Sequence, residues 1–254
     1  MLPIYTVHAL RLGTIKADKS ESVLGTPRGT MVEVPVWCAA IEGSGKRILV
    51  DTGLTDAEKW SQGNQHTIGP DETIDAALAE LGWKAKDVDL VVNTHLHYDH
   101  CSNNLAFPDA QFFVSRAEWE FASNPSSAQQ WAYDLEWTGP DLNYMNYTLI
   151  DADDYDVLRG LRVIKTPGHT PGHQAVVVNT AEGLVCIAGD AACVMENLTV
   201  PIPTGVFVSR GDALASIKKI CRCSDRVFMM HDPELTAFQA FGFPVSPSDW
   251  PGTT

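Results

Sequence analysis

The chain has 254 residues, 44% hydrophobic and 20% charged, a composition typical of a globular protein and unlike a disordered chain, a collagen or a coiled coil. Its 18 Lys and Arg against 32 Asp and Glu give a formal charge of −14. Such a surface repels nucleic acid and anionic lipid, so we expect a small neutral or cationic molecule, or a metal ion, as partner. No apolar run is long enough for a membrane span and no secretory signal pattern begins the chain, so a cytoplasmic location and reduced cysteines are expected.

Short strand-like runs alternate with amphipathic stretches along the chain. The strand-like runs are 34–41, 47–51, 88–93, 111–115, 161–166, 175–179, 184–188 and 226–230. Several are continuously apolar, which is typical of strands covered on both faces. A helix is predicted from a first turn at Asp71 and Glu72 through Leu81, with Gly82 as its stop. Further helices are predicted from a capping-box pattern at Ser115 and Glu118 and from Asp212 onward. Because strands and helices interleave without a dividing linker, residues 1–254 are predicted to form a single α/β domain.

The segment 124–147 follows neither the helical nor the strand period. It carries Trp131, Tyr133 and Trp137 among Ser, Asn, Gln, Gly and Pro. One interpretation is a surface excursion that packs its own aromatic side chains. The other is a cover over a site, since ligand pockets are lined mainly by apolar and aromatic groups.

The strongest chemical signal is the motif His95-x-His97-x-Asp99-His100, directly after the apolar run 88–92. The end of a strand is where open α/β sheets place their ligands. Three imidazoles and one carboxylate within six positions suit a borderline-soft divalent cation. His95 and His97 project to one side of an extended segment, whereas Asp99 and His100 are offset toward a second point. The spacing therefore favours two metal ions over one.

Three further ligand-type residues, His169, Asp190 and His231, each follow a strand-like run. His169 lies in the sequence TPGHTPGH, whose Pro and Gly residues form a tight turn that presents a side chain. One such residue alone is usually a cap or a surface group. Here the motif and the downstream positions indicate the same metal chemistry independently. His173, in the same turn, is expected to support the site rather than to bind metal.

Together with the sequence LVDTG at 49–53, these residues resemble the metallo-β-lactamase superfamily over nearly the whole chain. The resemblance implies an αββα sandwich with the ligands at one edge of the paired sheets. It also implies two ligand sets and a bridging residue: His95, His97 and His169 for the first metal ion, Asp99, His100 and His231 for the second, and Asp190 between them.

Within the superfamily the chain is most similar to the N-acyl-homoserine lactonase group, by its length, the TPGHTPGHQ sequence, the Gly-Asp-Ala stretch at Asp190 and the late His231-Asp232 pair. That group usually has a tyrosine, thought to stabilise the developing oxyanion, three residues after the bridging aspartate. This chain has Cys193 there. A thiol is shorter than a phenol and a weaker donor. Cys193 therefore predicts extra space near the second metal and a preference for an aryl-fused or heterocyclic lactone, or a related cyclic amide, over acyl-homoserine lactones.

The resemblance implies a hydrolase that opens a lactone with a metal-bridging hydroxide. We expect two divalent ions per chain; Zn, Fe, Mn and Co would all accept these ligands, and zinc is the expected metal. Asp99 is the candidate catalytic residue, as ligand and as proton carrier to the leaving alkoxide. The candidate substrate contacts are Cys193, Trp131, Tyr133 and Trp137.

Other functions are also weighed. The substrate is alternatively another small cyclic amide, ester or thioester, and from different classes the chain is a di-iron redox protein or a non-catalytic metal-binding module. The acidic surface argues against a nuclease. Secreted β-lactamases need an export signal, and those with a similar motif lack the bridging aspartate. The absence of Lys and Arg from 236–254 argues against a glutathione-thioester hydrolase, and assembly as a homodimer is left open.

Overall fold

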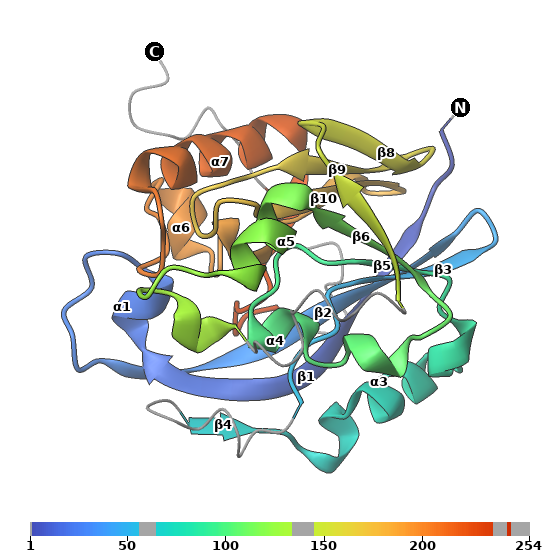
Figure 1. Cartoon of the computed structure of the whole chain (residues 1–254), viewed down its shortest axis with the longest axis horizontal. Coiled ribbons are helices and arrows are strands. Elements are labelled where there is room, and N and C mark those ends of the chain that lie inside the picture. The colour runs from blue at the N-terminus through green and yellow to red at the C-terminus, as the bar shows by residue number, and fades with distance from the viewer. Residues whose placement is uncertain (1, 56–64, 134–144, 236–242, 245–254) are drawn as a thin grey trace.

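The computed structural model describes residues 2–55, 65–133 and 145–235 and the short strand at 243–244. Two β-sheets stack face to face, and helices cover the outer side of each sheet (Figure 1). This is the predicted αββα sandwich.

The first sheet has the strand order β4-β1-β2-β3-β5-β6-β7. Its strands are β1 (Thr6–Asp18), β2 (Met31–Gly43), β3 (Lys46–Val50), β4 (Gln65–Thr67), β5 (Leu90–Val92), β6 (Gln111–Ser115) and β7 (Asn146–Ile150). Strands β3, β5, β6 and β7 pair in parallel, whereas β4, β1, β2 and β3 pair antiparallel. The carboxyl ends of β3 and β5 therefore lie at one edge of the sandwich.

The second sheet has the order β13-β12-β11-β10-β9-β8. Its strands are β8 (Asp154–Leu158), β9 (Leu161–Lys165), β10 (Gln174–Thr180), β11 (Gly183–Ile187), β12 (Arg226–Phe228) and β13 (Phe243–Pro244). Only β11 and β12 pair in parallel among these described strands. Their shared direction places the segments after both strands next to each other.

The helices are α1 (Lys19–Ser22), α3 (Ile74–Glu80), α4 (Tyr98–Cys101), α5 (Arg116–Ser123), α6 (Glu196–Thr199) and α7 (Arg210–Cys223). Ile74 and Leu78 of α3 are buried against the outer face of the first sheet, and Ile217 and Ile220 of α7 against that of the second. No helix in the described part of the chain has the length and hydrophobicity of a membrane span.

Alternate residues of each strand enter different layers, which explains the continuous apolar runs. In β10, Val176 and Val178 belong to the core between the sheets, whereas Val177 packs beneath α7. In β2, Ile41 likewise faces the central core and Ala40 faces α3. Burial on both faces removes the polar half of the strand pattern, as predicted from the sequence.

Each predicted strand overlaps an observed one, but β1, β4, β7, β8 and β13 were not predicted. In β1 the pairing register shifts between Arg11 and Thr14, and this irregularity breaks the alternation of apolar residues.

Helix α7 begins two residues before the predicted start, because Ser209 accepts a hydrogen bond from the Asp212 N–H (3.3 Å) and caps it. The predicted capping box at Ser115 and Glu118 is wrong: Ser115 makes no capping hydrogen bond, and the Glu118 carboxylate is turned toward the site described below.

Candidate metal centre

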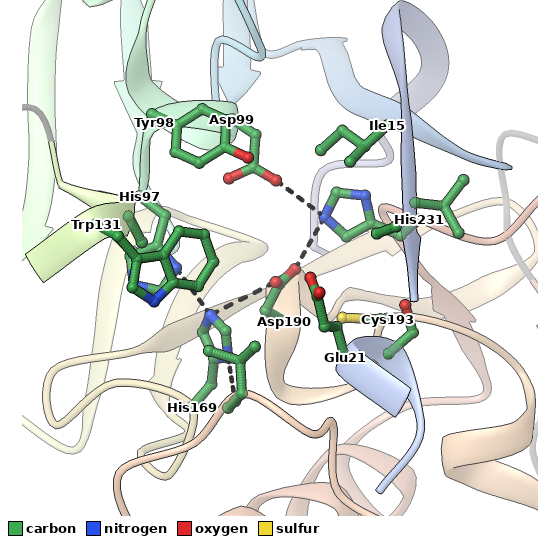
Figure 2. A pocket seen from close by; sticks show the side chains of 15 residues that line it. Ile15, Glu21, His97, Tyr98, Asp99, Trp131, His169, Asp190, Cys193 and His231 are labelled. Atoms are coloured by element: carbon green, nitrogen blue, oxygen red, sulfur yellow. Dashed lines mark hydrogen bonds and ion pairs between the residues drawn. The ribbon is translucent and has the colours of Figure 1, made fainter. Parts of the chain in front are cut away.

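The seven predicted ligands lie together at one edge of the sandwich. Figure 2 shows those that line the cavity: His97, Asp99, His169, Asp190 and His231. The loop after β5 carries His95 and His97, and α4 carries Asp99 and His100. The segments after β9, β11 and β12 supply His169, Asp190 and His231. Strand ends distant in sequence thus converge on one cavity.

The first cluster consists of His95, His97 and His169. One ligand atom from each lies within 4.8 Å of the others, and His97 Nδ1 is 3.0 Å from His169 Nε2. Burial lowers the pKa of all three imidazoles, and neighbouring histidines lower those of His95 and His97 further. The His95 Nε2 atom is buried without a hydrogen-bond partner. Neutral, dehydrated imidazoles with converging nitrogens are in the state that metal binding requires, so this cluster fits a divalent ion.

The second cluster consists of Asp99, His100 and His231, again with one ligand atom each within 4.8 Å. His231 Nε2 is 3.5 Å from Asp99 Oδ2 and 3.3 Å from His100 Nε2. Although burial opposes the charged form, the nearby carboxylates raise the pKa of both imidazoles. The carboxylates therefore create a strongly negative site that favours a bound cation.

Asp190 lies between the clusters. Its Oδ1 is 3.2 Å from the Nε2 atoms of both His100 and His231, and its Oδ2 is 3.5 Å from His169 Nε2. Burial opposes ionisation, but these three histidines hold the pKa of Asp190 well below its usual range. An ionised carboxylate with one oxygen toward each cluster is the arrangement that a bridge between two cations needs.

In three of the histidines, the ring nitrogen that faces away from the cavity has a partner. The His169 Nδ1–H donates to the Val206 carbonyl (2.7 Å) and the His231 Nδ1–H to the Pro35 carbonyl (2.8 Å). His100 Nδ1 is 2.7 Å from Asp51 Oδ2. Histidines that bind metal typically donate their other ring N–H to a carbonyl or carboxylate, which directs the free nitrogen inward. All three rings accordingly direct Nε2 at Asp190.

Asp51 orients the site although it is not among the residues that line the cavity. Besides His100, its carboxylate accepts hydrogen bonds from Thr94 N–H and Thr94 Oγ1, both at 2.7 Å. Its backbone is left-handed (φ +61°), a conformation that costs a non-glycine residue of order 1 kcal/mol or more. Such strain is tolerated where the surroundings fix the residue, here at the end of β3 beside the motif.

His173 is a supporting residue, as the sequence predicted. Its Nδ1 is 2.8 Å from Thr166 Oγ1, and its Nε2 accepts a hydrogen bond from the Asp190 N–H (3.0 Å). Gly189 permits this approach: its φ is +53°, and a Cβ there would lie 2.6 Å from His173 Nε2. His173 thereby fixes the backbone of Asp190.

Residues 31–227 match the model of the metallo-β-lactamase superfamily. The chain belongs to this superfamily. It is 32% identical over 237 residues to an N-acyl homoserine lactonase from Bacillus cereus, a match that covers 87% of this chain and 91% of that protein. To the N-acyl homoserine lactonase AttM from Rhizobium radiobacter it is 29% identical, with 91% and 94% covered.

Solved structures show the same relationship. An N-acyl homoserine lactone hydrolase with the product N-hexanoyl-L-homoserine at its catalytic metal center matches with a TM-score of 0.80 and 27% identity, over 92% of this chain and 95% of that one. The F107W mutant of AiiA from B. thuringiensis, with N-decanoyl-L-homoserine bound at the active site, matches with the same TM-score, identity and coverage. The metallo-β-lactamase fold of this chain thus extends over almost its full length.

In this superfamily member, Cys193 lies in the cavity wall beside Asp190 (Figure 2). Burial, together with the Asp190 carboxylate, raises the pKa of the thiol well above its usual value. Burial and the neighbouring carboxylate therefore disfavour the thiolate form of Cys193. The second cysteine near the motif, Cys101, is buried in a hydrophobic cluster with Leu96 and Val114 and acts as a small core residue.

The three aromatic candidates differ in position. Trp131 lines the cavity with His97 and His169, and its side chain lies at the mouth in Figure 2. Tyr133 is buried: its ring packs edge-on against His97, and its hydroxyl donates to Glu118 (2.8 Å). Trp137 lies outside the described residues.

Trp131→Ala is expected to raise KM about tenfold and to leave metal content unchanged. The indole is 52% exposed, so its loss costs little folding free energy but removes apolar contact area at the cavity mouth. Steady-state kinetics and elemental analysis measure both effects. Leu105→Ala, at a 41% exposed residue that is not among the residues lining the cavity, is the matched control. Kinetics equal to the wild type would show that Trp131 does not contact substrate.

The sequence reasoning missed Glu21, Gln129 and the role of Glu118. Glu21 of α1 lines the same cavity as His97 and Asp99 of the motif, a proximity that only the sandwich creates. Gln129 Nε2 donates to the His169 carbonyl (2.7 Å). Glu118 carried a signal, its place in a helix N-terminal pattern, but that signal suggested a capping role.

Proposed function

We propose that this chain is a dinuclear metal-dependent hydrolase that opens a neutral lactone ring. One observation carries the proposal: three histidines are tied at Nδ1 and direct Nε2 at Asp190, whose oxygens face both ligand clusters. The N-acyl homoserine lactonases to which the chain is similar support the class of reaction.

The charges around the cavity favour an uncharged substrate. Besides the candidate ligands Asp99 and Asp190, the charged residue in its lining is Glu21. Among the described residues that line the cavity, none is Lys or Arg. A phosphate ester, or a β-lactam with its carboxylate, would meet Glu21 without a protein cation to bind it. A lactone carries no such charge.

The residues around the cavity would have different roles in the hydrolysis. When bound, a pair of divalent ions supplies Lewis acidity and an activated water at neutral pH. The Asp190 carboxylate connects the two ligand clusters, and the Asp190 N–H donates to His173, which fixes the backbone there. Asp99, whose side chain is 12% exposed at the cavity, is placed to carry a proton to the leaving alkoxide. Trp131 and Cys193 line the space that would surround the lactone ring of the substrate.

The proposal is tested with protein purified without chelator, assayed against lactones, aryl esters, thioesters and β-lactams while acid release is followed with a pH indicator. We expect lactones to be the best substrates and elemental analysis to approach two metal ions per chain, with zinc as the expected ion. One ion per chain, unchanged by added zinc, would contradict the dinuclear site. Oxygen consumption without acid release would instead indicate a redox protein.

Cys193→Tyr tests which lactone fits. If Cys193 leaves space beside the second cluster, the wild type should prefer an aryl-fused or heterocyclic ring to a homoserine lactone. A restored phenol adds a donor worth roughly 3 kcal/mol, about 100-fold in kcat, for substrates small enough to share the space. We expect the variant to gain activity on acyl-homoserine lactones and to lose it on the bulkier rings.

Cys193→Ser, which keeps the size and changes only the donor, separates space from hydrogen bonding. The space hypothesis fails if homoserine lactones are already the best wild-type substrates and the tyrosine improves nothing.

A further inference from the structure

We infer that Glu118 is a positioning residue that locks the loop of His95 and His97 to the loop of His169. The inference rests on the proposed metal centre and concerns how its first cluster is held together. Glu118 lies in the first turn of α5, outside the cavity, and its side chain reaches inward between these two loops.

One carboxylate joins both ligand loops. Its Oε1 accepts a hydrogen bond from the N–H of Leu96, the residue between His95 and His97, at 3.0 Å. Its Oε2 accepts one from the hydroxyl of Thr170, the residue after His169, at 2.5 Å. Each hydrogen bond thus ends beside a candidate ligand. Relative movement of the two loops would break at least one of these bonds.

The aromatic segment adds a third attachment. The Tyr133 hydroxyl donates to Glu118 Oε1 (2.8 Å), and its ring packs against the His97 ring with centroids 4.7 Å apart. Gln129, in the same segment, donates to the His169 carbonyl (2.7 Å). Tyr133 therefore packs against the His97 ring, and Gln129 restrains the backbone of His169.

The chemistry of the residue fits this task. Glu118 is fully buried, and the Leu96 N–H and the Tyr133 and Thr170 hydroxyls that donate to it are all neutral. Burying an acidic side chain without a cation is costly, so helix packing alone would favour an apolar residue. What a carboxylate offers is acceptor capacity at both oxygens, which suits a site where every surrounding group is a donor. A glutamine would turn an NH2 group toward one of those donors.

Gly172 brings the His169 loop onto α5. A Cβ at Gly172 would lie 1.9 Å from the Glu118 backbone nitrogen, so any other residue would push the loop off the helix. The Gly172 N–H also donates to the Glu118 carboxylate. The second cluster has separate supports, since Asp51 and the Pro35 carbonyl hold His100 and His231. Loss of Glu118 should therefore weaken the first cluster selectively.

The test compares Glu118→Gln with Glu120→Gln, the same substitution on the exposed face of the same helix. Cobalt-loaded proteins are titrated with a chelator while cobalt release and the visible absorption spectrum are recorded. For Glu118→Gln we expect the affinity of one of the two ions to fall about 10- to 100-fold, with an altered cobalt spectrum. The other ion and the Glu120→Gln protein should behave as wild type.

Thr170 supplies a second pair of variants for the case in which Glu118→Gln does not fold. Thr170→Val removes one hydrogen bond and should weaken the same ion, whereas Thr170→Ser keeps the hydroxyl and should restore wild-type affinity. Unchanged affinities and spectra in Thr170→Val and in folded Glu118→Gln would overturn the inference. A wild-type protein that binds no metal would instead overturn the proposed function.

Discussion

Asp190→Ala is expected to lower kcat/KM for the best lactone by at least about 100-fold, because electrostatic stabilisation of the transition state is lost. Asp190 is the residue whose two oxygens face the two clusters, at 3.2 Å from His100 and His231 and 3.5 Å from His169. Without it the clusters lose their connection, and the mutual repulsion of two cations is no longer offset. Metal content should fall from two toward one ion per chain, measured by elemental analysis beside the kinetics.

Asp190→Asn provides the matched control, because it keeps the shape of the side chain and removes the charge. We expect a loss of activity of similar size, which would show that the charge and not the volume is required. Near-full activity with two bound ions in the alanine variant would refute the bridging role.

Asp51→Ala is expected to lower the free energy of unfolding by about 3 kcal/mol, since it leaves a buried charge partner and buried donors unpaired. The groups that would lose their partner are His100 Nδ1, the Thr94 N–H and the Thr94 hydroxyl, each 2.7 Å from the Asp51 carboxylate. Chemical denaturation of the metal-free protein measures this loss without a contribution from bound ions. Activity should fall as well, because the His100 ring would no longer be held.

Asp89→Ala is the control for this change. Asp89 pairs with Lys46 (2.7 Å) at the partly exposed start of β5, where an ion pair contributes up to about 1 kcal/mol. If both variants lost the same small amount of stability, Asp51 would not be a structural anchor of the site.

The sequence by itself identified the candidate metal ligands, because the motif from His95 to His100 is local. Its spacing follows directly from a strand end and one short helix, α4, so no tertiary contact is needed to recognise it. The downstream candidates were recognisable for the same reason, since each follows an apolar run long enough to be a strand. Continuous apolar runs also predicted strands covered on both faces. The core between the sheets and the two cores beneath the outer helices confirm this.

Only the tertiary structure decided which groups hold those ligands in place. Glu118 sits where a helix-capping residue is expected, and its true partners, Leu96 and Thr170, are 22 and 52 residues away. Tyr133, an aromatic residue in an aperiodic segment, packs on His97 instead of facing the cavity mouth as Trp131 does. Hydrogen bonds of this kind depend on which loops the two sheets bring side by side, and no periodicity in the chain encodes that proximity. Local pattern therefore specified the candidate ligands, and long-range packing specified their orientation.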